Sequence, residues 1–225
     1  MSAGEATTNS SRDLSDAKQR VLDVAERLFM QRGYAAITLR DIADALNMRQ
    51  ASLYYHFPEG KEQLFVAVAT LVFERHQAGM QRAIDTAEAD LASRMHALAG
   101  WFASQPPLNL LGMTHADFPA LSESNAHTLA QIGYRALFTP LRNLFLAAQD
   151  RGEIRTIHPD LLAGCFLALI DSASVIRQQP TVPPRHSMVD EMILVLLEGL
   201  YPRPAPVACA QSPMQPQRAP DVVSP

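Results

Sequence analysis

The sequence predicts an all-α protein in which three helices at the N-terminal end precede a larger helical domain. Apolar residues recur at the spacing of a helix in almost every patterned stretch, and neither strand-like alternation nor an internal repeat is visible. The chain has 225 residues, 48% of them apolar and 19% charged, which is typical of a globular protein with one large domain or two small ones.

The composition argues against a membrane-spanning or secreted protein. The longest apolar runs, such as Cys165–Ile170 and Met192–Leu197, are too short to span a bilayer. The first residues lack the apolar core of a secretory signal, and the two cysteines form no disulfide framework. We therefore expect a cytoplasmic protein.

The first predicted helix covers residues 15–32 and ends at Gly33, since glycine favours the left-handed turn that follows a helix. We expect residues 1–14, which precede it, to form a disordered arm. The apolar stripe of the first helix consists of Val21, Leu22, Ala25, Leu28 and Phe29.

Two short helices follow. Thr38 and Asp41 form a capping box at the start of the second helix, and Asn47 can take the left-handed turn at its end. The third helix, residues 50–57, begins two or three residues later and ends before Pro58. Two short helices that are joined by a tight turn and packed on a preceding helix form a helix-turn-helix.

This helix-turn-helix unit covers residues 15–60, and the other helices form a second domain over residues 61–201. Pro140 is expected to kink the longest of the later helices. The tail, residues 202–225, holds seven prolines and should be disordered. The predicted ranges after residue 60 are 61–84, 90–104, a short helix within 106–124, 125–150, 160–178 and 187–200.

The last two predicted helices are apolar around most of their circumference, as in "LLAGCFLALIDSASVI" and "MVDEMILVLLEGL". A helix of this kind is buried on more than one side. In a domain of this size the additional side is most simply covered by a second subunit, so we expect a homodimer.

The third helix has two distinct faces. Leu53 and Phe57 share one side, with Arg49 and His56 at its edge. We expect this side to pack inward and the opposite arc to face solvent. The outward arc consists of Ala51, Ser52, Tyr54 and Tyr55.

This outward arc suits the major groove of DNA. Ala51 allows the helix backbone to approach base edges, and Ser52 can bond to a base or a phosphate. The tyrosine hydroxyls can donate to phosphate oxygens, which positions the helix without reading sequence. Arg49 and Gln50, at the start of the helix, are the candidates for reading bases.

Charge alone does not indicate DNA binding. The net charge is −4, and residues 1–65 carry eight Lys or Arg against nine Asp or Glu. Positive groups must therefore be placed locally. Lys61, with the amides that open the next helix, can bind one phosphate, and Arg40 can reach another. Paired short helices also occur in many helical proteins of other function, so this pattern leaves DNA binding as one alternative.

The stretch Thr38–Lys61, "TLRDIADALNMRQASLYYHFPEGK", resembles the DNA-binding signature of TetR/AcrR-family transcriptional regulators. The likeness covers roughly residues 15–65, with the turn, the recognition helix and the following lysine in register. It implies a helical core that includes Leu39, Ile42, Leu53 and Phe57. It also implies DNA contacts, mostly to phosphates, from Thr38, Gln50, Tyr54, Tyr55, His56 and Lys61.

The chain departs from the usual pattern of that family at several positions. Asn47 and Ala51 stand where glycine is common, and Arg49 stands where Ser or Thr is frequent. Arg49 therefore weakens the cap of the third helix or moves it to Asn47, and it adds a cation near the groove. The turn "PEGK" is also one residue longer than the commonest version. The operator preference of relatives consequently does not carry over.

The resemblance implies that the second domain binds an effector and dimerises, although no motif within it can be transferred. The candidates for the pocket wall are apolar and aromatic residues, each of which by itself fits an ordinary core better. Together they favour a hydrophobic or aromatic effector. They are Trp101, Phe102, Leu108, Met113, Phe118, Tyr134, Phe138 and Leu141.

Polar groups could anchor such an effector. Asp171 is the foremost candidate because it lies in an otherwise apolar helix; alternatively it pairs with Arg177 or faces a partner subunit. The histidines do not fall at metal-ligand spacing, so we expect neither a metal nor a cofactor. The other polar candidates are His76, His96, His115, Tyr134 and Arg177.

These observations predict an all-α regulator with an N-terminal three-helix helix-turn-helix domain followed by a helical ligand-binding and dimerisation domain. The resemblance implies a repressor that binds a pseudo-palindromic operator as a dimer and leaves it when a small effector binds. An activator or accessory regulator on the same fold is the alternative. An enzyme is not expected, because the sequence has no nucleophile elbow, glycine-rich phosphate loop, metal motif or carboxylate pair placed for acid–base chemistry.

Overall fold

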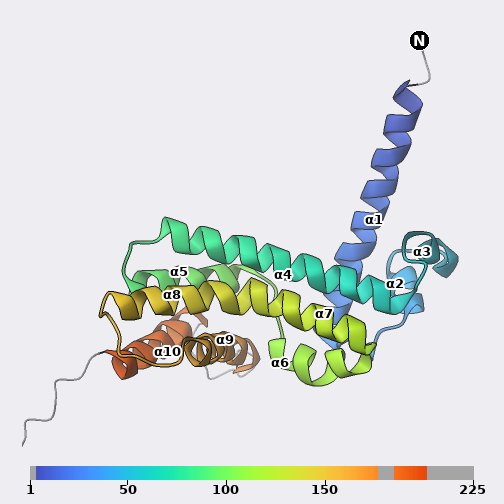
Figure 1. Ribbon diagram of the computed structural model, residues 1–225. Helices are drawn as coiled ribbons and strands as arrows, with labels where there is room; N and C mark the ends of the chain where they lie inside the picture. The colour runs from blue at the N-terminus through green and yellow to red at the C-terminus, as the bar shows by residue number, and fades with distance from the viewer. Residues whose placement is uncertain (1–3, 177–184, 202–225) are drawn as a thin grey trace, which may run out of the picture.

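The computed structural model describes residues 4–176 and 185–201. Over these residues every regular element is helical and no strand is present, as predicted (Figure 1). The first three helices lie at one end of the molecule, beside the start of the long helix α4, and the other helices form a bundle along the rest of α4. None of the helices in this described part is long and apolar enough to cross a membrane.

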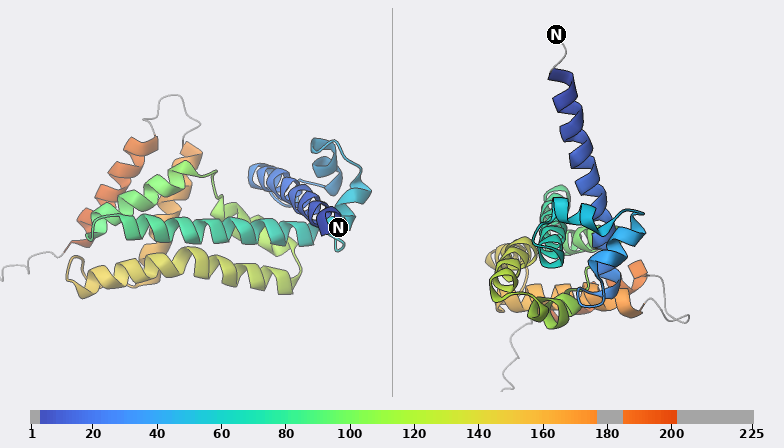
Figure 2. Two further views of the ribbon diagram at one scale, coloured as in Figure 1. Left: turned by 90° about the horizontal axis from the view of Figure 1, so that it is seen from above. Right: turned by 90° about the vertical axis from the view of Figure 1, so that its right-hand side faces the viewer.

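The first helix, α1 (Gly4–Arg32), is longer than predicted. Residues 4–14, expected to be a disordered arm, continue the helix, and its N-terminal end projects away from the other helices (Figures 1 and 2). The apolar stripe predicts only the part of α1 that packs on other helices, where Val21, Ala25 and Phe29 are buried. A helix can continue beyond its packed part because each added residue completes another backbone hydrogen bond without a new nucleation cost.

Helix α4 (Lys61–Thr86) connects the two parts of the molecule. It follows α2 (Leu39–Ala45) and α3 (Gln50–His56), and it packs against α1 at its start. Farther along, α4 packs against α5 (Leu91–Ser104) and α7 (Glu123–Gly133). Helix α4 therefore contacts both the helix-turn-helix and the bundle.

The irregular link after α5 forms three short turns of helix instead of one short helix with loops. They are α6 (Leu110–Gly112), the π-helical turn η1 (Met113–Asp117) and the 3₁₀ turn η2 (Phe118–Ala120).

The helix predicted over residues 125–150 is divided by a π-helical turn, η3 (Tyr134–Phe138), which lies between α7 and α8 (Thr139–Asp150). Pro140 has no backbone N–H and cannot continue the α-helical hydrogen bonding. The chain accommodates it by widening the turn directly before the proline, as π turns commonly do within helices.

The last two helices, α9 (Pro159–Ile176) and α10 (Arg185–Leu200), pack on each other and complete the bundle. Helix α9 also packs on α8, and α10 packs on α5. The predicted end of α9 at residue 178, the candidate Arg177 and the tail over residues 202–225 lie outside the described residues.

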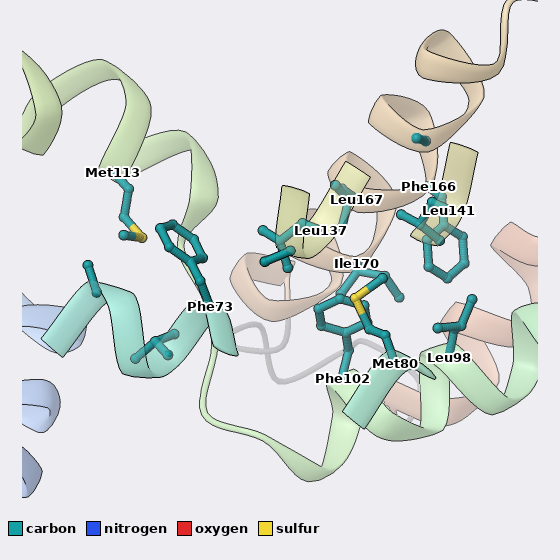
Figure 3. Close-up of a cluster of buried hydrophobic side chains, with 14 of the residues drawn as sticks. Phe73, Met80, Leu98, Phe102, Met113, Leu137, Leu141, Phe166, Leu167 and Ile170 are labelled. Atoms are coloured by element: carbon teal, nitrogen blue, oxygen red, sulfur yellow. The ribbon is translucent and has the colours of Figure 1, made fainter. Parts of the chain in front are cut away.

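The centre of the bundle is an apolar core to which helices from both its layers contribute (Figure 3). Its members come from α4, α5, η3, α8 and α9 and are almost completely buried. Those nearest the middle of the view are Met80, Leu98, Phe102, Leu137, Leu141, Phe166, Leu167 and Ile170.

Candidate nucleic-acid interface

The start of α2 is fixed by the predicted capping box. The backbone N–H of Asp41 donates to Thr38 Oγ1 over 3.2 Å, and the backbone N–H of Thr38 donates to Asp41 Oδ2 over 2.7 Å. The Thr38 hydroxyl donates to the same carboxylate over 2.7 Å. These bonds hold the pKa of Asp41 below its ordinary value. Thr38 is exposed, as a DNA contact requires, but its hydroxyl is already engaged within the capping box.

The turn between α2 and α3 is built on Asn47, whose φ of 52° is left-handed as predicted. The Met48 N–H donates to the Ala43 carbonyl over 3.0 Å and closes the turn. Arg49 is the N-cap residue of α3, and its side chain makes no capping hydrogen bond. The cap is therefore weak and does not move to Asn47, which leaves the Arg49 guanidinium at the exposed start of the helix.

The two faces of α3 lie as the sequence predicts. Leu53 and Phe57 are fully buried against the other helices of the helix-turn-helix. Tyr54 is 46% exposed and Tyr55 is 71% exposed, while His56 lies at the boundary. An arc of small and hydroxyl-bearing groups thus faces solvent without a supporting role in the core. Ala51 and Ser52 of the arc are exposed, and so are Arg49 and Gln50 at the start of the helix.

Two cations flank this arc in different ways. Arg40 is fully exposed on α2 and lies 3.9 Å from Asp44, a surface pair that holds it only weakly. Lys61, at the start of α4, is half-buried, with its Nζ 4.0 Å from the centre of the Tyr34 ring. Burial lowers the pKa of Lys61, while the negative charges of Asp117 and Asp41 oppose that shift. Lys61 therefore lies at the junction with the second domain and not on the open face of α3.

Asp117, which the sequence analysis does not single out, joins this junction from the bundle side. It is only 4% exposed, and its carboxylate accepts the backbone N–H of Tyr34 over 2.8 Å. Burial raises the pKa of Asp117, although this bond and Lys61 work against the shift. Its signal in the sequence is an acid inside the apolar stretch "GMTHADFPAL", the kind of residue that needs a specific partner.

A second connection runs from α4 to the N-terminus of α7. Glu62 accepts hydrogen bonds from the Ser122 backbone N–H over 2.8 Å and from Asn125 Nδ2 over 2.7 Å. The Ser122 hydroxyl donates to the same oxygen, and these bonds lower the pKa of Glu62. The segment from η1 to α7 is thereby tied to the residues that follow the helix-turn-helix.

A third connection is the ion pair between Arg75 of α4 and Glu26 of α1. The guanidinium donates two hydrogen bonds, of 3.0 and 2.6 Å, to the two carboxylate oxygens. Bidentate geometry fixes the relative orientation of the two helices more firmly than a single contact would. Helix α1 is therefore connected to α4 by this ion pair, in addition to the chain that continues through Gly33.

The predicted effector residues do not form one pocket. Phe102, Leu108 and Asp171 line a narrow cleft between α5, α6 and α9, with a cavity volume of about 10 Å³. Asp171 is half-buried there and accepts the Leu111 N–H over 3.4 Å. Met113 and Leu141 are buried in the core, Phe118 and Phe138 lie at its edge, and Trp101 packs against α4.

Tyr134 lies at the surface of the molecule. It is 45% exposed, its ring stacks on Phe138, and its hydroxyl donates to Asp160 over 2.9 Å. Tyr134 therefore belongs to the outer surface between η3 and α9.

Comparison with known proteins agrees with this geometry. Residues 21–68 match the family described as "Bacterial regulatory proteins, tetR family". The chain is 43% identical over 51 residues to the HTH-type transcriptional regulator LmrA of Bacillus subtilis, a match that covers 23% of this chain and 27% of LmrA. It is 25% identical over 192 residues to the HTH-type transcriptional repressor DhaR of Mycobacterium sp. strain GP1, covering 82% of this chain and 92% of DhaR.

The fold extends the likeness beyond the helix-turn-helix. The crystal structure of AibR in complex with isovaleryl coenzyme A and operator DNA superimposes with a TM-score of 0.64, covering 79% of this chain and 96% of AibR at 21% identity. The stronger sequence matches thus concern the helix-turn-helix, and the likeness of the whole chain lies in its fold. The relatives named are transcriptional regulators, and residues 21–68 of this chain match the DNA-binding domain of the TetR family.

Proposed function

We propose that the chain is a ligand-responsive transcriptional repressor of the cytoplasm. In this proposal it binds a pseudo-palindromic operator as a homodimer and leaves the DNA when a small hydrophobic or aromatic effector binds the second domain. The observation that carries the proposal is the exposed arc of α3, whose opposite side is fixed in the core by Leu53 and Phe57. The name of DhaR, a repressor, and the operator complex of AibR support the same class of function.

The arc has two tasks in this proposal. Tyr54 and Tyr55 donate to phosphate oxygens and set the position of α3 in the major groove. Arg49 and Gln50, at the exposed N-terminal end of α3, contact base edges. Ser52 lies between these groups and His56 at the C-terminal end of α3, and both add contacts to the backbone of the DNA. Arg40 approaches a neighbouring phosphate from α2.

A second copy of the chain is the proposed partner at the outer face of α9 and α10. Leu161, Leu194 and Val195 are 60%, 54% and 70% exposed there. An open apolar groove of about 850 Å³ runs between the two helices. Exposed apolar side chains beside an apolar groove support association at this face, and in this proposal the two copies place their recognition helices about 34 Å apart, in successive major grooves. The groove is lined by Cys165, Ala168, Leu169, Met192, Val195 and Leu196, among others.

The release step is proposed to act through α4. An effector within the bundle would displace α4 or the segment from η1 to α7, and the bonds of Glu62 and Asp117 would pass this movement to the helix-turn-helix. Release requires that the effector bind the DNA-incompetent arrangement more tightly than the DNA-bound one.

Fluorescence anisotropy tests the proposal with a labelled duplex taken from the DNA that flanks the gene of this protein. We expect specific binding that weakens steeply as the salt concentration rises, because phosphate contacts release counterions. A duplex of the same composition with scrambled sequence is the control. Equal affinity for both duplexes, or no binding at low salt, would contradict the repressor function.

A further inference from the structure

His76 of α4 is a buried polar residue without a partner among the described residues. It is 1% exposed, and neither ring nitrogen makes a hydrogen bond within that part of the chain. Its ring stacks on Phe102 of α5 at 5.1 Å between centres and meets the edge of Trp101 at 6.1 Å. Trp101 Nε1 is likewise buried and unbonded there. Two neighbouring rings thus hold hydrogen-bonding groups with unused capacity, which is costly in a protein interior.

The chemistry of this pair is specific. Burial, together with the charge of Arg75, lowers the pKa of His76 to about 4. The imidazole is therefore neutral near pH 7 and presents one N–H donor and one acceptor nitrogen, while the indole presents a donor only. A hydroxyl group complements them, because it can donate to the imidazole nitrogen and accept from the indole N–H.

A charged group fits this pair less well. An anion would need a cation beside it, but the Arg75 guanidinium is already bound by Glu26 in two hydrogen bonds. The Arg82 guanidinium lies over the Trp101 ring, 5.9 Å from its centre, and Arg82 is exposed on the surface of α4. A cation would be repelled by both arginines, and among the described residues the carboxylate of the cleft, Asp171, already accepts the Leu111 N–H.

The narrow cleft described above provides the way in. Phe102 is shared between the two places, since its ring stacks on His76 and also lines the cleft beside Leu108, Ile170 and Asp171. In Figure 3 the Phe102 ring lies within the core cluster, beside Met80 and Ile170. Rotation of this one side chain would join the cleft to the two unbonded rings.

We propose that His76 and Trp101 bind the hydroxyl of an uncharged, hydrophobic phenol or alcohol that enters the cleft by displacing Phe102. The apolar body of the ligand takes the place of the Phe102 ring, and its hydroxyl bridges the imidazole and the indole N–H. This site specifies the chemical class of the effector and rests on the proposed function for its regulatory meaning. The ligand site itself can be tested without DNA.

The test uses the full-length protein and two matched probes, 4-ethylphenol and 4-ethyltoluene, in which a methyl group replaces the hydroxyl. Calorimetry gives the two affinities. Because Trp101 is the single tryptophan of the chain, its indole N–H gives one distinct NMR signal that reports on this site alone. We expect 4-ethylphenol to bind at least about tenfold more tightly than 4-ethyltoluene, which corresponds to the energy of one or two neutral hydrogen bonds, and to shift the indole signal.

Variants separate the hydroxyl contact from simple apolar binding. His76→Phe should retain the affinity for 4-ethyltoluene and reduce the preference for the phenol to nearly one. Phe102→Ala should bind both probes more tightly, since a cavity of about 150 Å³ accommodates a benzene ring. Phe29→Ala is the control, because it opens a core position in the helix-turn-helix, where Phe29 packs on Phe65. The Phe29→Ala variant should bind 4-ethylphenol more tightly than 4-ethyltoluene at the bundle site by the same factor as the wild type.

Three results would overturn the site. They are a phenol preference that survives His76→Phe, phenol binding that leaves the indole signal unmoved, and absence of phenol binding in Phe102→Ala. The 4-ethylbenzoate anion represents charged ligands. If it bound more tightly than 4-ethylphenol, that result would also contradict the assignment. Failure of the proposed function is distinguishable, because it would appear as probe binding that does not change operator affinity or as a protein that binds no operator.

Discussion

At the scale of single residues, the exposed tyrosines of α3 separate positioning from reading. The Tyr55 side chain is 71% exposed and does not support the core, so Tyr55→Phe removes only the hydroxyl. We expect operator affinity to fall about ten- to a hundredfold, the worth of one hydrogen bond to a charged phosphate, and by the same factor for all operator sequences. Gln50→Ala should instead change the ranking among operators. Anisotropy titrations on a set of point-substituted duplexes measure both, and a uniform loss from Gln50→Ala would contradict the division.

His76 gives a second residue-scale prediction, on pH. Its pKa is about 4 in the folded protein and about 6.5 in the unfolded chain, so the unfolded chain takes up the proton first as the pH falls. The free energy of unfolding therefore decreases between about pH 6.5 and pH 4, by up to about 3 kcal/mol at 1.36 kcal/mol per pKa unit. Urea denaturation of the wild type and of His76→Phe at about pH 7.5 and pH 4.5 isolates this contribution. The variant should lose about 2 kcal/mol less than the wild type, whereas parallel pH profiles would exclude the shift.

At the scale of elements, the contact between α4 and α5 depends on Gly79. The Trp101 indole lies so close to the α4 backbone that a Cβ at position 79 would overlap its ring. Gly79→Ala should destabilise the protein by about 1–3 kcal/mol of overpacking, reduced by the gain of about 1 kcal/mol in helix propensity. It should also shift Trp101 fluorescence.

Gly100→Ala on α5 is the matched control for that change, since a Cβ there meets no atom within 4 Å. It should stabilise the protein by up to about 1 kcal/mol. Thermal unfolding followed by circular dichroism compares the two variants. Equal effects of both substitutions would mean that Trp101 does not rest on α4.

The elements also show which features can be predicted from sequence. The faces of α3, the capping box at Thr38 and the turn at Asn47 depend on residues within a few positions of each other, so local periodicity and turn chemistry identify them. The bond from Asp117 to Tyr34 joins residues 83 positions apart, and no local pattern reports it. The π turn η3, which begins at Tyr134, is likewise not reported by the apolar pattern of the helix.

At the scale of the whole molecule, the apolar face of α9 and α10 decides whether two recognition helices can act together. A stable interface buries about 1,200–2,000 Å² in total, and a dimer through this face would have the exposed Val195 side chain near its apolar groove. Val195→Glu should convert the protein to a monomer, because it would bury a carboxylate among the apolar residues of the groove, where Arg155 and Glu191 are the charged residues that line it.

The same substitution should weaken operator binding by at least about a hundredfold, since one recognition helix alone lacks the gain from simultaneous binding of both half-sites. Sedimentation equilibrium and anisotropy are measured together on Val195→Glu and on Leu111→Glu. Leu111 is the matched control because it is 57% exposed but lies on α6, outside the α9 and α10 face. A monomeric Val195→Glu variant that keeps full operator affinity would show that the DNA-binding unit is a single chain, and a dimeric one would place the interface elsewhere.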